Sequence, residues 1–279
     1  MALHFNAITN DYKNADALAW ILHDGMDKCD RVFISKDRHY FHLQTPVLDV
    51  LSGEEIGSIA YTVKRDDEEE ALELLDLDFL LYTDEYTELE FTDRLGGPED
   101  LNRHYEAVAF PQRQHLEVET VNRYTVTDKM DGSKRKVRAS VFPFGMNVFK
   151  DMDAFNSWAG IGNEQEKEIA DTGIKLRGYS ETFAMPGGVI DDNEDNSFSF
   201  LIGRVKDLRD VRISFGDVSW DFVLAHIHCA LGTVPAAMGR EVFDLSGLAP
   251  NTIVAMNADV KADLSKPDDF TYYGRRRDR

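Results

Sequence analysis

Apolar and polar residues alternate along the first 65 positions in two successive patterns. The first has the three- and four-residue spacing of an amphipathic helix, at Leu18, Ile21, Leu22 and Met26. Asn14 or Asp16 stands at the position expected for its N-cap. Short β-branched and aromatic runs follow at residues 31–35, 39–45 and 56–65, with polar turns between them. The pattern predicts an opening helix and then an antiparallel meander.

An acidic run begins at Asp66 and leads into leucines from Leu72 onward. Acidic side chains complement the positive end of a helix dipole, so we predict a helix around residues 71–75. A strand is predicted at residues 87–93. Pro98 stands at a helix-starting position, and we expect a short helix within residues 96–108.

The middle of the chain has the pattern of a long β-hairpin at about residues 115–142. Polar and apolar residues alternate on its first arm, and Asp131-Gly132 is a turn signal in the connection. A short helix is predicted after Phe149, with Asp151 as its cap. The polar stretch 162–173 is a candidate linker.

The last third of the chain is the most strongly β-patterned. Strands are predicted at residues 198–214, 219–230, 232–238 and 253–264, with a turn at Gly216-Asp217 and an irregular or helical link at 240–252. Gly203 lies in the middle of the first of these strands. A glycine in a long strand allows the sharp bend with which one strand joins both halves of a small barrel.

This strand order, with the link before the segment "IVAMNADVKADL", resembles the oligonucleotide/oligosaccharide-binding (OB) fold over residues 197–265. The resemblance implies a small β-barrel, which could bind single-stranded nucleic acid through a basic strand face with aromatic residues. The candidate residues for such a face, or for contact with another partner, are Arg204, Lys206, Arg209, Arg212 and Trp220.

Together these patterns predict an α+β protein that is rich in antiparallel strands. The expected organisation is an acidic α+β region with an N-terminal meander and a few short helices at residues 1–180, an OB-like β-barrel at 181–270 and a basic flexible tail at 271–279.

Composition narrows the classes of function. The chain of 279 residues has a net charge of −20, and residues 1–100 hold 24 acidic against 8 basic side chains. Such a surface repels phosphate backbones, which argues against nucleic-acid binding by that third. The two cysteines, Cys29 and Cys229, form no disulfide framework. The sequence has no signal-peptide pattern and no apolar run long enough for a bilayer, so we expect a cytoplasmic protein without membrane contact.

His226 and His228 are the main candidates for a metal-binding site. On a strand they project from the same face about 7 Å apart, as in strand-borne metal sites. Cys229 projects from the opposite face, and no third ligand stands at a recognisable spacing; His104 or His115 would have to come from a distance. The sequence therefore favours the interpretation that both histidines lie at the polar end of an ordinary strand. The alternative is that they bind a divalent transition metal as a cofactor.

The sequence contains no complete set of residues at a spacing typical of a catalytic site. We expect a non-catalytic interaction protein with a protein partner, and the long predicted hairpin suggests a possible homodimer. Two alternatives stay open: a metal-dependent hydrolase that uses His226 and His228, and a single-stranded nucleic-acid-binding protein that uses the C-terminal strands.

Overall fold

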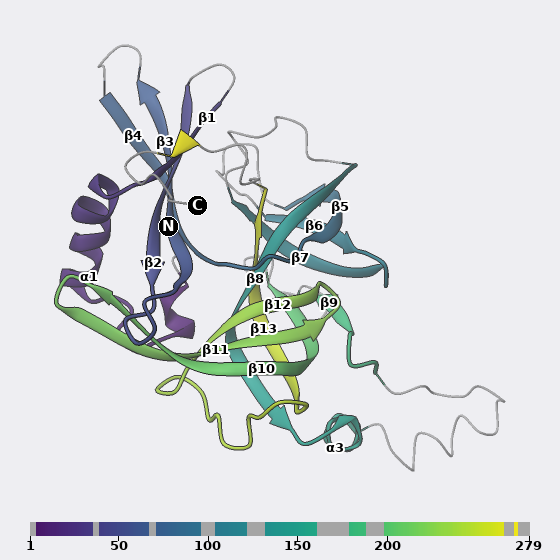
Figure 1. The fold of residues 1–279 in the computed structure, drawn as a ribbon. Coiled ribbons are helices and arrows are strands. Elements are labelled where there is room, and N and C mark those ends of the chain that lie inside the picture. The colour runs from purple at the N-terminus through teal and green to yellow at the C-terminus, as the bar shows by residue number, and fades with distance from the viewer. Residues whose placement is uncertain are drawn as a thin grey trace, which may run out of the picture.

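The computed structural model describes residues 4–35, 39–66, 71–95, 104–121, 132–160, 179–187, 198–264 and 271–272, and these residues form two β-sheets (Figure 1). The described helices of the α class are short, Ala15–Trp20 (α1) and Met152–Trp158 (α3). Most strand pairs are antiparallel, which confirms the expected β-rich α+β class. None of the described helices has the length and apolar character needed to cross a membrane.

The first sheet has the strand order β14-β1-β2-β3-β4. Its strands are β1 (Arg31–Ile34), β2 (Tyr40–Leu48), β3 (Glu55–Asp66), β4 (Ala71–Leu81) and β14 (Thr271–Tyr272). Strands β1, β2 and β3 pair antiparallel in sequence order, so the predicted meander is confirmed.

Two expectations for this sheet are wrong. Residues 71–75 belong to strand β4 and not to a helix, because this segment pairs with β3 from Asp66↔Ala71 to Gly57↔Leu81. Leu77, Phe79 and Leu81 then alternate into the core, a period-two pattern that an acidic helix start does not explain. Thr271 and Tyr272, expected in a flexible tail, pair with β1, while residues 273–279 lie outside the described part.

The second sheet has the strand order β11-β12-β8-β5-β6-β7-β13-β10-β9. Its strands are β5 (Thr87–Arg94), β6 (His104–Ala109), β7 (Gln114–Val121), β8 (Ser133–Phe149), β9 (Ala184–Pro186), β10 (Ser199–Phe215), β11 (Val218–Cys229), β12 (Gly232–Gly239) and β13 (Ile253–Asp263). The predicted C-terminal strands and the turn at Gly216 are confirmed, and the link at 240–252 is irregular. Residues 104–108, expected to end a helix, lie in β6.

The two arms of the predicted 115–142 hairpin have other partners. Among the described residues, β7 pairs with β6 and β13, whereas β8 pairs with β5, β12 and β13. The hairpin prediction is therefore wrong in its pairing, although both segments are strands. Long-range neighbours replaced the local partner, since the β8–β13 ladder runs from Phe149↔Ile253 to Arg138↔Asp263.

Within the described residues, the strands of the C-terminal third do not close on one another without β8. The pairings trace a circuit β10-β11-β12-β8-β13-β10, in which β8 separates β12 from β13. Strand β8, which precedes residue 180, pairs with β12 and β13, which follow it, and the expected domain division near residue 180 stays a prediction. The candidate linker at 162–173 lies outside the described residues.

Strand β11 separates two hydrophobic cores. Val223, Ala225 and Ile227 belong to the core inside the second sheet. The alternate side chains Trp220, Phe222 and Leu224 belong to the core between the two sheets. This division follows the period-two alternation of the strand and agrees with the two apolar faces that the sequence gives it.

The N-terminal segment fills the core between the sheets. Phe5 is 2% exposed and its ring lies 5.4 Å from that of Phe79, 5.4 Å from that of Phe215 and 4.9 Å from that of Trp220. Helix α1 follows, with the Asn14 side chain accepting hydrogen bonds from two backbone N–H groups in the first turn, as predicted. Asp151 caps α3 by accepting a hydrogen bond from the backbone N–H of Ala154.

Candidate functional site

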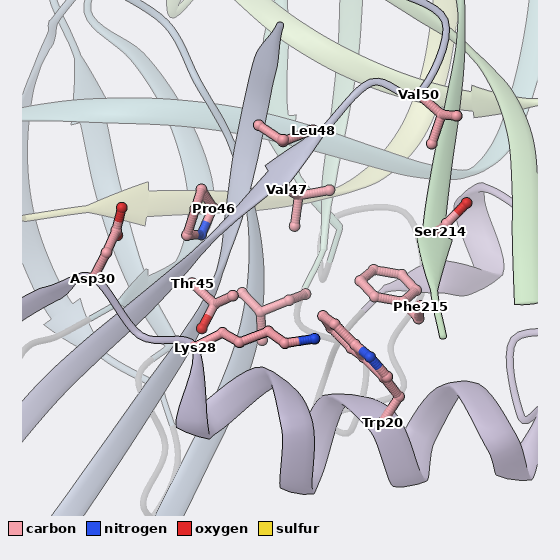
Figure 2. Close-up of a pocket in the computed structure, with 11 residues that line it drawn as sticks. Trp20, Lys28, Asp30, Thr45, Pro46, Val47, Leu48, Val50, Ser214 and Phe215 are labelled. Atoms are coloured by element: carbon pink, nitrogen blue, oxygen red, sulfur yellow. The ribbon is translucent and has the colours of Figure 1, made fainter. Parts of the chain in front are cut away.

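A cleft of about 470 Å³ lies between the α1 region, strand β2 and the end of β10 (Figure 2). Its lining is mostly apolar, with a few polar side chains at the margin: Trp20, Lys28, Asp30, Thr45, Pro46, Val47, Leu48, Val50, Ile59, Ser214 and Phe215. This volume and this mixture are typical of sites that hold a small molecule or a single large side chain.

The aromatic wall of the cleft is formed by Trp20 and Phe215, whose ring centroids are 5.6 Å apart. The Lys28 ammonium lies 4.7 Å from the Trp20 ring centroid and points along the cleft toward the indole (Figure 2). A cation placed so is attracted by the ring face. The wall thus combines an apolar surface with one cationic group.

A wider helical turn at Ile21–Gly25 sets the position of this wall. The Tyr61 hydroxyl donates to the Ile21 carbonyl at 2.6 Å, which gives a partner to a carbonyl at this irregular turn. Burial raises the pKa of Tyr61, so this hydroxyl keeps its proton. Gly25 is required here, since an added Cβ would come within 2.4 Å of that hydroxyl oxygen.

An exposed apolar patch, the rim, adjoins the cleft at the end of β2 and in the turn that follows, and is formed by Leu48, Val50 and Leu51. Leu48 and Val50 also line the cleft, and Leu51 follows Val50 in the chain. Their exposed fractions are 43%, 56% and 59%. Large apolar side chains are normal on a surface when scattered, but a group of three beside an apolar cleft is typical of an interaction surface.

Buried Asp49 fixes this rim against β10. Its Oδ1 accepts from the backbone N–H groups of Leu51 and Arg212, both at 3.0 Å, and its Oδ2 accepts from the Ser52 hydroxyl at 2.6 Å. Burial raises the pKa of Asp49, but these hydrogen bonds outweigh it and hold the pKa below its usual value. The rim is therefore preorganised before any partner arrives.

Cys29 lies beside the cleft, with its sulfur 3.2 Å from the Thr45 hydroxyl oxygen. Burial raises the pKa of this thiol to about 11. The thiolate is the reactive form of cysteine, so Cys29 is unsuited to nucleophilic chemistry near neutral pH.

The structure places His226 and His228 on β11 where the core between the sheets ends. His226 Nδ1 lies 2.6 Å from Asp207 Oδ1, and His228 Nδ1 lies 3.4 Å from Thr233 Oγ1. Across the described ranges, no three His, Cys, Asp or Glu side chains gather in a way that could hold a metal ion. His115, a distant candidate for a third ligand, is paired with Glu106 at 3.0 Å.

The candidate basic face is divided among other partners. Arg204 pairs with Glu181, Arg209 with Glu54 and Arg212 with Asp221. Lys206 is exposed, whereas Trp220 is 5% exposed and lies in the core between the sheets. The structure does not bring these five side chains together into one basic face with an exposed aromatic ring.

A buried ionic cluster joins the two sheets and was not foreseen from the sequence. Lys261 on β13 is fully buried; its ammonium lies 2.6 Å from Asp78 Oδ1 on β4 and also donates to Glu119 on β7. The ring of His4 lies between Glu119 and Asp259, with Nε2 at 3.1 Å from Glu119 Oε2 and Nδ1 at 2.8 Å from Asp259 Oδ2. A single lysine in an alternating strand gave no signal of burial, because its partners lie 183 and 142 positions away.

Both ring nitrogens of His4 face carboxylates, so the cationic form with two N–H groups fits best. Burial and the Lys261 ammonium lower the pKa of His4, but the Asp259 and Glu119 carboxylates outweigh them and the net effect raises the pKa. A raised pKa means that the folded state binds the proton more tightly than the unfolded chain does. His4 therefore stabilises the fold fully below its unfolded pKa of about 6.5, and this contribution is lost as the pH rises through the folded pKa.

We expect the His4→Gln variant to be less stable than the wild type at low pH and to approach it as the pH rises. The measurement is urea unfolding of both proteins at several pH values between about 5.5 and 9, within the range where histidine protonation changes. A difference in free energy of unfolding that stays constant, or that grows with pH, would contradict this role.

Sequence reasoning missed the cleft. One signal was available, the exposed leucine and valine residues of "PVLDVLSG" next to a turn. The aromatic wall had no such signal, since Trp20 and Phe215 come from distant segments. Comparison with protein-family models, with curated proteins and with solved structures gives no match for this chain.

Proposed function

We propose that this chain is a non-catalytic binding protein whose cleft receives an apolar side chain of a basic protein partner. The observation that carries the proposal is the continuity of the apolar cleft with the exposed rim of Leu48, Val50 and Leu51. A ligand confined to the cleft would leave this rim in water, whereas a protein surface would cover both. An anchoring side chain in a pocket surrounded by flatter apolar contacts is typical of protein interfaces.

Charge supports a basic partner. The chain carries a net charge of −20, and the segment that lines the cleft with Trp20, Lys28 and Asp30 also carries the exposed acids Asp24 and Asp27. Complementary charge accelerates association and selects among partners. The alternatives of a metal-dependent hydrolase and of single-stranded nucleic-acid binding stay predictions, as do an OB-like barrel, a homodimer and a cytoplasmic location.

The test is selection from a displayed random-peptide library on the full chain. We expect enrichment of peptides that place a large apolar residue next to lysine or arginine. The Val50→Asp variant is expected to weaken their binding by about 2 kcal/mol, roughly a 30-fold higher Kd, because Val50 lines the cleft and the change puts a charge into the apolar contact. The Kd is measured by fluorescence anisotropy of the labelled peptides.

Leu72→Asp is the matched control, since Leu72 on β4 is 59% exposed, against 56% for Val50, but does not line the cleft. It should leave the Kd unchanged. Failure to enrich such peptides, or an equal loss of binding in both variants, would overturn the proposal. Enrichment of apolar peptides without basic residues would overturn the part that concerns charge.

A further inference from the structure

The outer end of β11 carries two histidines that the proposed function does not use. His226 and His228 are two positions apart on the strand, on the side of β11 that holds Trp220 and Phe222 further along. That side is covered by the core between the sheets as far as Leu224. Beyond that point His226 and His228 are partly exposed, so a solute can reach both rings.

Each of these rings has its Nδ1 atom occupied by a neighbour. Asp207, opposite His226 on β10, lies 2.6 Å from His226 Nδ1, and Thr233, opposite His228 on β12, lies 3.4 Å from His228 Nδ1. A proton on Nδ1 of His226 donates to the carboxylate, which leaves the lone pair on Nε2. Metal-binding histidines almost always hold their second nitrogen in this way, because the partner fixes the tautomer and makes the ligand more basic.

The spacing also suits one shared ion. Side chains at i and i+2 of a strand leave the same face about 7 Å apart, and imidazole nitrogens bind Zn²⁺ at about 2.0–2.1 Å. Rings that lean toward one another can therefore reach one ion. Arg204, the neighbour of His228 on β10, is held by Glu181, and the exposed Asp207 carboxylate adds negative charge beside the pair.

The geometry points to a surface site for a divalent transition metal, Zn²⁺ or Cu²⁺, with His226 and His228 as its two protein ligands. Imidazole suits both ions, and Cu²⁺ binds nitrogen sites more tightly than Zn²⁺. The remaining coordination positions are open to water or to a ligand from outside the chain. Asp207 is a positioning residue that acts through His226.

The experiment is titration of the full chain, without an affinity tag, with Zn²⁺ and Cu²⁺ by calorimetry. We expect one site that His226→Ala and His228→Ala each weaken by about 100-fold, because each removes half of a chelating pair. Asp207→Asn should weaken it by about 10–100-fold without changing either ligand. In the Cu²⁺ complex, electron paramagnetic resonance should show coupling to two nitrogen ligands.

His115→Ala is the matched control, since His115 is exposed and also pairs with a carboxylate of the neighbouring strand but lacks a second histidine two positions away. This variant should bind the metal as the wild type does. Circular dichroism checks that each variant is folded, and the exposed Asp207 allows a variant that leaves the core intact. Wild-type affinity in the His226 or His228 variants, or an equal loss in His115→Ala, would overturn the site.

Discussion

Replacing Lys261 by methionine is expected to lower the free energy of unfolding by about 3–5 kcal/mol. The Lys261 side chain is 0% exposed, and the Asp78 and Glu119 carboxylates that face it are 1% and 4% exposed. Methionine fills a similar volume but supplies no charge, so two buried carboxylates lose their shared cation. Removing one partner of a buried ion pair is strongly destabilising, because the charge that stays behind remains out of water.

The measurement is urea or guanidinium unfolding of Lys261→Met against Lys134→Met. Lys134 also pairs with an acid, Glu90 at 3.5 Å, but its side chain is 53% exposed. An exposed pair contributes about 0–1 kcal/mol, so this variant should stay near the wild type. Equal losses in the two variants would contradict the importance of burial.

A variant that keeps the lysine is a milder change to the same cluster. Asp78→Asn removes one carboxylate and leaves Glu119 as the partner of the ammonium. It should therefore destabilise less than Lys261→Met does. A larger loss in Asp78→Asn would show that the lysine is not the centre of the cluster.

Replacing Phe5 by alanine is expected to cost about 3–5 kcal/mol, the usual range for deleting a buried phenylalanine. The Phe5 ring packs among aromatic rings from both sheets, at Phe79, Phe215 and Trp220. Alanine leaves a cavity at their junction that the surrounding strands cannot close without losing their pairing. Because Phe215 also lines the cleft, the same change should loosen the aromatic wall.

Chemical unfolding of Phe5→Ala and Tyr12→Ala checks this expectation. Tyr12 belongs to the same N-terminal segment but is 38% exposed, and a surface change of this kind usually stays within about 0.5 kcal/mol. Phe5→Leu should fall between alanine and the wild type, since it refills part of the cavity. Similar stabilities for Phe5→Ala and Tyr12→Ala would show that the N-terminal segment is not part of the core.

The ionic contacts of His4 and the aromatic contacts of Phe5 explain how the cleft keeps its shape. His4 pairs with carboxylates on β7 and β13, and Phe5 packs in the core between the sheets. Asp49 then ties the rim to β10. Polar and apolar contacts thus combine to hold the walls of the cleft in place.

Features that depend on a few neighbouring residues were predictable from the sequence. Asn14 and Asp151 cap their helices because a short polar side chain reaches N–H groups two or three positions ahead. The period-two pattern of β11 predicted which of its side chains share a face. The prediction of a helix at residues 71–75 is wrong because the acidic run leads into strand β4, whose alternating side chains Leu77, Phe79 and Leu81 face the core.

Tertiary structure alone decided the pairing of β7 and β8, the burial of Lys261 and the cleft. Each depends on residues far apart in the chain, such as Asp78 with Lys261 or Trp20 with Phe215. A strand's pattern shows that it needs a neighbour but not which one, and a charge can be buried only where a distant partner compensates it. The sequence by itself determined strands, caps, turns and strand faces; the assembly of two sheets around the N-terminal segment determined where a site could form.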